Sequence, residues 1–197
     1  DLKRSKTPTD VLDKEVIDYI NDYVFQETIN IFIRKRENID GEYQGQERKR
    51  GAILALNKML VTKKADDFFF ILHRDFPVPQ YIVTLDADNM VLPGGVREMV
   101  NMITHPYNKK YDLLSTQNRY NLFSFRKKYS RKFLAECGID VYPHYSTFYY
   151  SLFGKEIFCG KGIYRLSSFY KKLEGTFPEK RILSHDIIEG SVLETGA

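Results

Sequence analysis

The sequence predicts an α/β domain in which a mostly parallel sheet is flanked by helices. Apolar runs of strand length alternate along the chain with segments of helical periodicity. The run at residues 81–85 reads Tyr-Ile-Val-Thr-Leu and is typical of a strand buried on both faces. Asp86 and Asp88 follow it directly, where open α/β sheets bind their ligands.

Length and composition fit a globular protein with a sizeable core, and we expect one domain over residues 1–197. The net charge of +4 comes from basic residues spread along the chain, which does not favour nucleic acid as a partner. The two cysteines form no disulfide framework. No apolar run approaches the roughly 18 residues that span a bilayer, so we expect the segment itself to be soluble.

The first part of the chain predicts two helices and two strands. Residues 8–25 carry apolar side chains at helical spacing after a Thr-Pro start, with Thr7 as the cap. Residues 29–33 alternate as a strand does, and 34–46 form a polar loop. A helix follows from about residue 47, and 68–72 is a further strand.

The second part repeats this alternation. After the acidic motif, a Pro-Gly-Gly turn leads into a short helix over 96–103. A strand is predicted at 113–117 and a helix with a basic stripe at 121–136. Residues 158–164 read as a strand, a turn and a second strand, and a last helix starts near Ser184.

Asp86 and Asp88 favour a bound cation. Buried carboxylates without a partner are costly, and two oxygen-bearing groups with a gap between them suit Mg²⁺ or Mn²⁺. The alternative is a strand that simply ends in a polar turn.

Arg48, Lys49 and Arg50 lie at the start of the second predicted helix. Basic side chains and backbone N–H groups converge there, which suits a diphosphate. A solvated run of charge ahead of a surface helix is the alternative.

Two further motifs carry chemistry. Gly160 and Gly162 flank Lys161, which permits close approach of the backbone to a ligand. Asp186 is a third acidic group, with a local helix-capping role as its alternative. His185 beside it is a secondary candidate, as a ligand or as a helix-end residue.

In this order the motifs resemble the glycosyltransferase domain of cyclic β-1,2-glucan synthases, which are inverting, family-2-like enzymes of the GT-A type. The resemblance covers about residues 30–190. The segments that carry it are 47–51 (Glu-Arg-Lys-Arg-Gly), 84–88 (Thr-Leu-Asp-Ala-Asp), 152–154 (Leu-Phe-Gly), 160–164 (Gly-Lys-Gly-Ile-Tyr) and 182–190 (Ile-Leu-Ser-His-Asp-Ile-Ile-Glu-Gly).

The resemblance implies a GT-A-like, Rossmann-like fold that transfers glucose from UDP-glucose to a growing β-1,2-glucan with the help of Mg²⁺ or Mn²⁺. Asp86 and Asp88 would hold the metal, and Asp86 with residues 48–50 would bind the donor phosphates. Residues 160–162 would line the acceptor approach, and Asp186 would be the general base.

The sequence departs from this pattern in places. Arg165, Thr147 and Ser151 stand where acids are expected. The first nucleotide-binding strand and the C-terminal acceptor and membrane region have no counterpart. We therefore expect an incomplete domain, inactive alone, that belongs to a larger membrane-embedded synthase at the cytoplasmic face of the cell membrane.

Two other functions compete with this interpretation. A strand followed by Asp-x-Asp also opens haloacid-dehalogenase-type phosphatases, in which the first Asp is the nucleophile. A non-catalytic fragment that binds nucleotide sugars is the third hypothesis.

Overall fold

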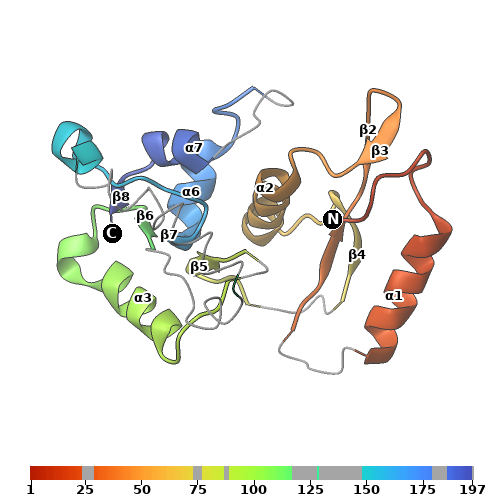
Figure 1. Ribbon diagram of the computed structural model, residues 1–197, viewed down its shortest axis with the longest axis horizontal. Helices are drawn as coiled ribbons and strands as arrows, with labels where there is room; N and C mark the ends of the chain where they lie inside the picture. Colours follow the sequence, from red (N-terminus) through yellow and green to blue (C-terminus); the bar gives the residue numbers. More distant parts are fainter. Residues whose placement is uncertain are drawn as a thin grey trace. The chain divides into compact units, whose positions relative to one another are not determined.

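A computed structural model describes residues 1–23, 29–72, 77–86, 89–116, 128, 148–178 and 186–196. The chain divides into two compact units. Unit 1 consists of Asp1–Gln80 with Glu174–Leu183, and unit 2 of Tyr81–Leu173 with Ser184–Ala197. Helices and strands alternate in both units (Figure 1), as expected of an α/β protein. Among the described residues, no helix combines the length and the apolar character that crossing a bilayer requires.

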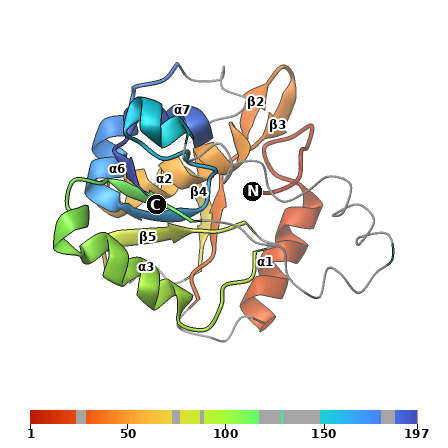
Figure 2. The same cartoon turned by 60° about the vertical axis from the view of Figure 1, so that its left-hand side comes forward.

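Unit 1 is built on a two-stranded antiparallel sheet. β1 (Phe32–Arg34) pairs with β4 (Phe68–Ile71). Figures 1 and 2 both show this pair between α1 (Val11–Tyr23) and α2 (Arg48–Thr62). The buried apolar side chains described in this unit are Ile20, Ile33, Met59, Leu60 and Phe68.

Helix α1 begins later than predicted, at Val11 rather than Pro8. The backbone N–H of Asp10 donates to Oδ2 of Asp13 at 2.8 Å, and the N–H of Leu12 donates to Oδ1 of Asp10 at 3.4 Å. Two acids therefore cap the first turn reciprocally, in place of the Thr7 cap that we expected.

A hairpin occupies the segment predicted as a polar loop. β2 (Glu37–Ile39) pairs antiparallel with β3 (Glu42–Gln44). Asp40 and Gly41 connect them with φ angles of 54° and 87°. Two consecutive left-handed residues form the tight turn whose twist matches that of a hairpin, so the loop assignment was wrong.

Unit 2 contains a four-stranded sheet in the order β5-β7-β6-β8. Its strands are β5 (Tyr81–Thr84), β7 (Gly162–Arg165), β6 (Leu113–Ser115) and β8 (Thr195–Gly196). β7 runs antiparallel to both of its neighbours, and only the β6–β8 pair is parallel. The described strands thus do not form the mostly parallel sheet that we expected, because β7 enters between β5 and β6 in the opposite direction.

Helices cover the two faces of this sheet. Figures 1 and 2 both show α3 (Gly95–Thr104) on one side, with α6 (Leu166–Leu173) and α7 (Asp186–Val192) on the other. A short 3-10 helix, Pro106–Asn108, follows α3. Tyr81, Val83, Met99, Val100 and Tyr111 pack against a core of Ile103, Leu114 and Ile163.

Arg165, the residue found where the resemblance led us to expect an acid, ties α3 to the sheet. Its Nη2 donates to the carbonyl of Ile103 at 2.6 Å, at the end of α3. Its Nε donates to the carbonyl of Tyr111 at 3.0 Å, and Nη1 donates to the Tyr81 hydroxyl at 3.1 Å. The guanidinium therefore satisfies the carbonyl of Ile103, which the end of α3 leaves without an intrahelical partner, and bonds the segment just before β6 at Tyr111.

The remaining element predictions have mixed outcomes. The strands predicted at 68–72, 81–85 and 113–117 are confirmed as β4, β5 and β6, each shorter by one or two residues. Of the two strands expected in 158–164, only the second forms, as β7. The helix predicted at 121–136 lies outside the described residues, except for Lys128.

Candidate active site

The end of β5 and the start of β7 bring two of the predicted site residues together. Thr84, the last residue of β5, lies opposite Gly162, the first residue of β7. Asp86 and Lys161 extend from these adjacent strand ends. The Lys161 Nζ lies 2.9 Å from Oδ2 of Asp86, and both side chains are partly exposed. The pairing of the two strands therefore determines this ion pair.

A turn fixes the backbone of Asp86. Its N–H donates to Oδ1 of Asn89 at 2.8 Å, and its carbonyl accepts from the N–H of Asn89 at 3.0 Å. The polar turn that we considered as an alternative is therefore present, but it uses main-chain groups of Asp86, whose carboxylate contacts Lys161. Asn89, which supplies both partners of this turn, was not among the predicted site residues.

The charge of Asp186 also affects the pKa of Lys161. Burial alone would lower the pKa of Lys161, but the hydrogen bond and charge of Asp86 outweigh it, and the charges of Cys159 and Asp186 add to them. The pKa of Lys161 is raised in sum, so the ammonium stays charged at neutral pH.

Asp186 lies against the backbone of Gly160. Asp186 is the first residue of α7, and Gly160 has a φ of +77°. A Cβ added at Gly160 would lie 2.7 Å from Oδ2 and 2.8 Å from Oδ1 of Asp186, closer than atoms can approach. We call Asp86, Lys161, Gly160 and Asp186 the acid–lysine cluster. It joins residues from three distant parts of the sequence within unit 2.

Gly162 has a structural reason to be glycine. A Cβ at this position would lie 2.2 Å from the carbonyl oxygen of Leu114 in β6. Close packing of β7 on β6 therefore requires this glycine, whatever approaches from outside the sheet.

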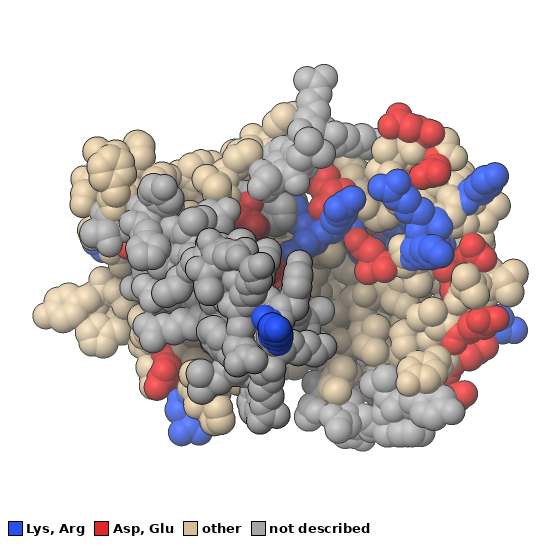
Figure 3. Space-filling model, in the orientation of Figure 1, with Lys and Arg blue, Asp and Glu red and all other residues tan. Residues whose placement is uncertain are grey.

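The predicted phosphate-binding residues belong to unit 1. Arg48 is exposed and Lys49 is half-buried at the start of α2. Arg50 is buried, forms an ion pair with Glu47, and stacks 5.6 Å from the centre of the Phe177 ring. On the face drawn in Figure 3, basic side chains lie among acidic ones rather than in a patch of one sign.

The chemistry of the acid–lysine cluster fits a hard cation in part. Asp86 offers the oxygen ligand that Mg²⁺ and Mn²⁺ prefer, and the Lys161 ammonium beside it shows that the site accommodates positive charge. Within the described part of the chain, no group of three His, Cys, Asp or Glu could hold a metal. Asp88 and His185 lie outside the described residues.

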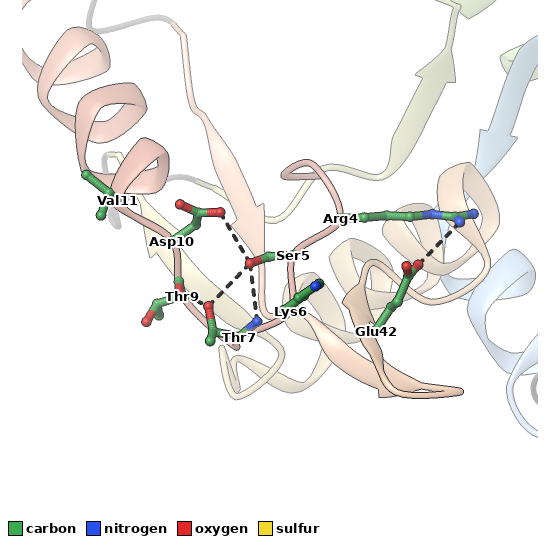
Figure 4. A pocket seen from close by; sticks show the side chains of 8 residues that line it. All are labelled: Arg4, Ser5, Lys6, Thr7, Thr9, Asp10, Val11 and Glu42. Atoms are coloured by element: carbon green, nitrogen blue, oxygen red, sulfur yellow. Dashed lines mark hydrogen bonds and ion pairs between the residues drawn. The ribbon is translucent and has the colours of Figure 1, made fainter.

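A pocket of about 540 Å³ lies elsewhere, in unit 1 (Figure 4). Its polar side chains bond one another. The Ser5 hydroxyl contacts Asp10 at 3.2 Å and Thr7 at 3.3 Å, and Arg4 lies 3.6 Å from Glu42. The pocket contains none of the catalytic, metal-binding or phosphate-binding candidates of the sequence analysis, so we place the candidate site at the acid–lysine cluster. The residues that line the pocket are Arg4, Ser5, Lys6, Thr7, Thr9, Asp10, Val11 and Glu42.

Comparison with known proteins relates the chain to a glucan synthase. It is 29% identical, over an alignment of 215 positions, to the cyclic beta-(1,2)-glucan synthase NdvB of Rhizobium meliloti (strain 1021). The alignment covers 97% of this chain, and the chain spans 8% of the length of that relative. No protein-family profile matches the chain.

Proposed function

We propose that the chain carries the catalytic part of an inverting glucosyltransferase, which transfers glucose from UDP-glucose to a growing β-1,2-glucan. One observation supports this most strongly. Lys161 and Gly160 link a strand-end acid, Asp86, to a second acid, Asp186, within one compact unit. Inverting sugar transfer needs one group to support the leaving diphosphate and another to accept a proton. The relationship to a glucan synthase supports the same reaction class.

In the proposed reaction, the acceptor 2-hydroxyl oxygen attacks the anomeric carbon of the donor glucose. The bond from that carbon to the diphosphate oxygen breaks, and its electron pair leaves with UDP. Asp186 accepts the proton of the attacking hydroxyl. Because bond formation and bond breaking occur on opposite faces of the carbon, the configuration inverts.

Charge at the leaving group is the second requirement. Asp86 and Asp88 would hold the divalent cation, Mg²⁺ or Mn²⁺, which when bound neutralises the diphosphate. Arg48 and Lys49, which the sequence suggested as further phosphate ligands, belong to unit 1, where the guanidinium of Arg50 already pairs with Glu47. The protein would be part of a synthase at the cytoplasmic face of the membrane, with the glucan as its second substrate.

The decisive experiment compares two acidic positions in the full-length protein. Asp186→Asn should reduce glucose transfer from UDP-glucose by roughly 10²–10⁴-fold while donor binding stays near native, since only the proton acceptor is lost. Glu194→Gln is the control, because Glu194 lies just beyond α7 and pairs with Lys155 at 3.1 Å. Near-native transfer by the Asp186 variant would refute the proposal.

A phosphatase remains the second candidate function, and the Asp86–Lys161 ion pair is the observation that favours it. A nucleophilic Asp at a strand end also benefits from an adjacent ammonium. Hydrolysis of a simple phosphate monoester, lost in Asp86→Asn but retained in Asp186→Asn, would favour this alternative over sugar transfer.

A further inference from the structure

The contact between Gly160 and Asp186 has an unusual geometry. The Cβ that Gly160 lacks would lie 2.7 Å from Oδ2, 2.8 Å from Oδ1 and 2.9 Å from Cγ of Asp186. Both oxygens of the carboxylate, with Cγ slightly behind them, therefore face the position that a Cβ of residue 160 would occupy. The space that any other residue would fill is therefore occupied by the acidic group itself.

The segment that carries Gly160 is held along α7 by further contacts. The N–H of Glu156 donates to the carbonyl of Thr195 at 3.0 Å. A Cβ at Gly190 would lie 2.8 Å from the Cβ of Phe158, so these two residues also touch closely. The segment and the stretch from α7 to β8 thus run side by side in opposite directions, with a glycine at two of three contacts.

The residue after Gly160 extends this arrangement to the other acid. Lys161 contacts Asp86 at 2.9 Å, and its carbonyl accepts from the N–H of Thr116 at 3.2 Å, next to β6. One short segment therefore contacts Asp186 on one side and Asp86 on the other. The contact with Asp186 is made at the Gly160 backbone, and the contact with Asp86 is made by the Lys161 side chain.

We propose that Gly160 is a positioning residue, whose missing side chain leaves the space that the Asp186 carboxylate occupies and so holds that carboxylate in register with Asp86. The inference rests on the proposed role of Asp186 as the general base. A side chain at residue 160 would push the carboxylate out of place while leaving the donor site alone. A shift of about 1 Å in a catalytic group can cost roughly 10²-fold in rate.

The chain offers a matched control. Gly154 has a φ of +67°, close to the +77° of Gly160, but a Cβ there would meet nothing within 4 Å. Gly154→Ala and Gly160→Ala therefore impose similar backbone strain, and only the second places a methyl group on Asp186.

Both variants should be measured in the full-length protein with UDP-glucose and a glucan acceptor. Gly160→Ala should lower kcat by roughly 10- to 100-fold with a donor KM within about threefold of native, whereas Gly154→Ala should retain most of kcat. Gly160→Ala should also lower the thermal stability more than Gly154→Ala does. When both changes are made in an Asp186→Ala background, this difference in stability should disappear, because no carboxylate remains to be displaced.

Equal kcat values for the two alanine variants would overturn the inference, as would a raised donor KM with native kcat. Asp186→Glu provides a second test if Gly160→Ala fails to fold. Its extra methylene has no room against Gly160, so a Glu variant with near-native kcat would also overturn it. Near-native transfer by Asp186→Asn would refute the proposed role of Asp186 as the base. If Asp186→Asn loses transfer but Gly160→Ala and Gly154→Ala have equal kcat values, only the proposed role of Gly160 is refuted.

Discussion

Single residues of the acid–lysine cluster have separable roles. Asp86 is held by a turn through its backbone and by Lys161 through its carboxylate. A cation that binds Asp86 must compete with that ammonium. The ion pair therefore sets part of the affinity of the proposed metal site.

We predict that Lys161→Met will tighten Mn²⁺ binding by about two- to fivefold, because a partly exposed ion pair of roughly 0.3–1 kcal/mol no longer has to be displaced. Isothermal titration calorimetry would measure this. Lys172→Met is the control, since Lys172 pairs with Asp112 at 2.5 Å instead. Unchanged or weaker binding after Lys161→Met would contradict the competition.

A second prediction at this scale concerns Arg165. Arg165→Met should lower the free energy of unfolding by roughly 2–4 kcal/mol, because the carbonyls of Ile103 and Tyr111 lose a charged donor. Arg97 is the control, an exposed arginine on α3 at which Met should cost less than about 0.5 kcal/mol. Urea denaturation would compare the two variants, and equal costs would show that Arg165 does not anchor the helix.

Among the elements, α1 depends on a buried ion pair. Asp13 in its first turn contacts Arg36, just ahead of β2, at 2.6 Å, and both side chains are almost fully buried. The guanidinium also donates to the carbonyls of Lys3 and Pro8 at 2.8 and 3.1 Å. One arginine thus connects the N-terminal segment, the helix and the hairpin.

This pair should make the stability of α1 dependent on acid pH. The hydrogen bond from Arg36 lowers the pKa of Asp13 below its ordinary value of 3.8, although burial opposes it. The stabilisation is therefore complete above that value and is lost as the pH falls through the lowered pKa. Asp13→Asn should cost about 3–5 kcal/mol at neutral pH and remove this acid transition.

Thermal unfolding followed by circular dichroism between pH 2 and 7 would measure both effects. Lys58→Met should cost at most about 1 kcal/mol, since the Lys58–Asp67 pair is largely exposed. A native acid transition in Asp13→Asn would assign the pH dependence to other groups.

Local sequence signals predicted those elements that local interactions determine. The apolar periodicity of α2 and α3 and the apolar runs of β4 and β5 were sufficient. Asp40 and Gly41 are also typical of a hairpin turn. The hairpin was not predicted because the strands on either side of this turn are mostly polar.

Elements and contacts that depend on the pairing of strands far apart in the sequence could not be predicted. The direction of β7 follows from its two partners, both far away in the sequence. The contact of Lys161 with Asp86 and that of Gly160 with Asp186 depend on the same pairing. Sequence motifs could therefore nominate these residues, but they could not say which of them meet.

At the scale of the whole molecule, each of the two units consists of two separate segments of the sequence. Unit 1 takes in residues 174–183 although unit 2 separates them from residue 80 in the sequence. Phe177 in this returning stretch lies under the Arg50 guanidinium. We predict that residues 1–80 alone resist proteolysis less than the same residues joined to 174–183 by a short linker. Equal half-lives with trypsin would show that unit 1 does not need the returning stretch.

The strand order of unit 2 has a consequence for its biosynthesis. β5 and β6 are not neighbours, because β7 fits between them, and β7 leaves the ribosome roughly 50 residues after β6. At about 5–20 residues per second, the nascent chain displays two strands with open edges for several seconds. Unpaired strand edges can pair with other chains, so β5 and β6 are open to such pairing during this interval.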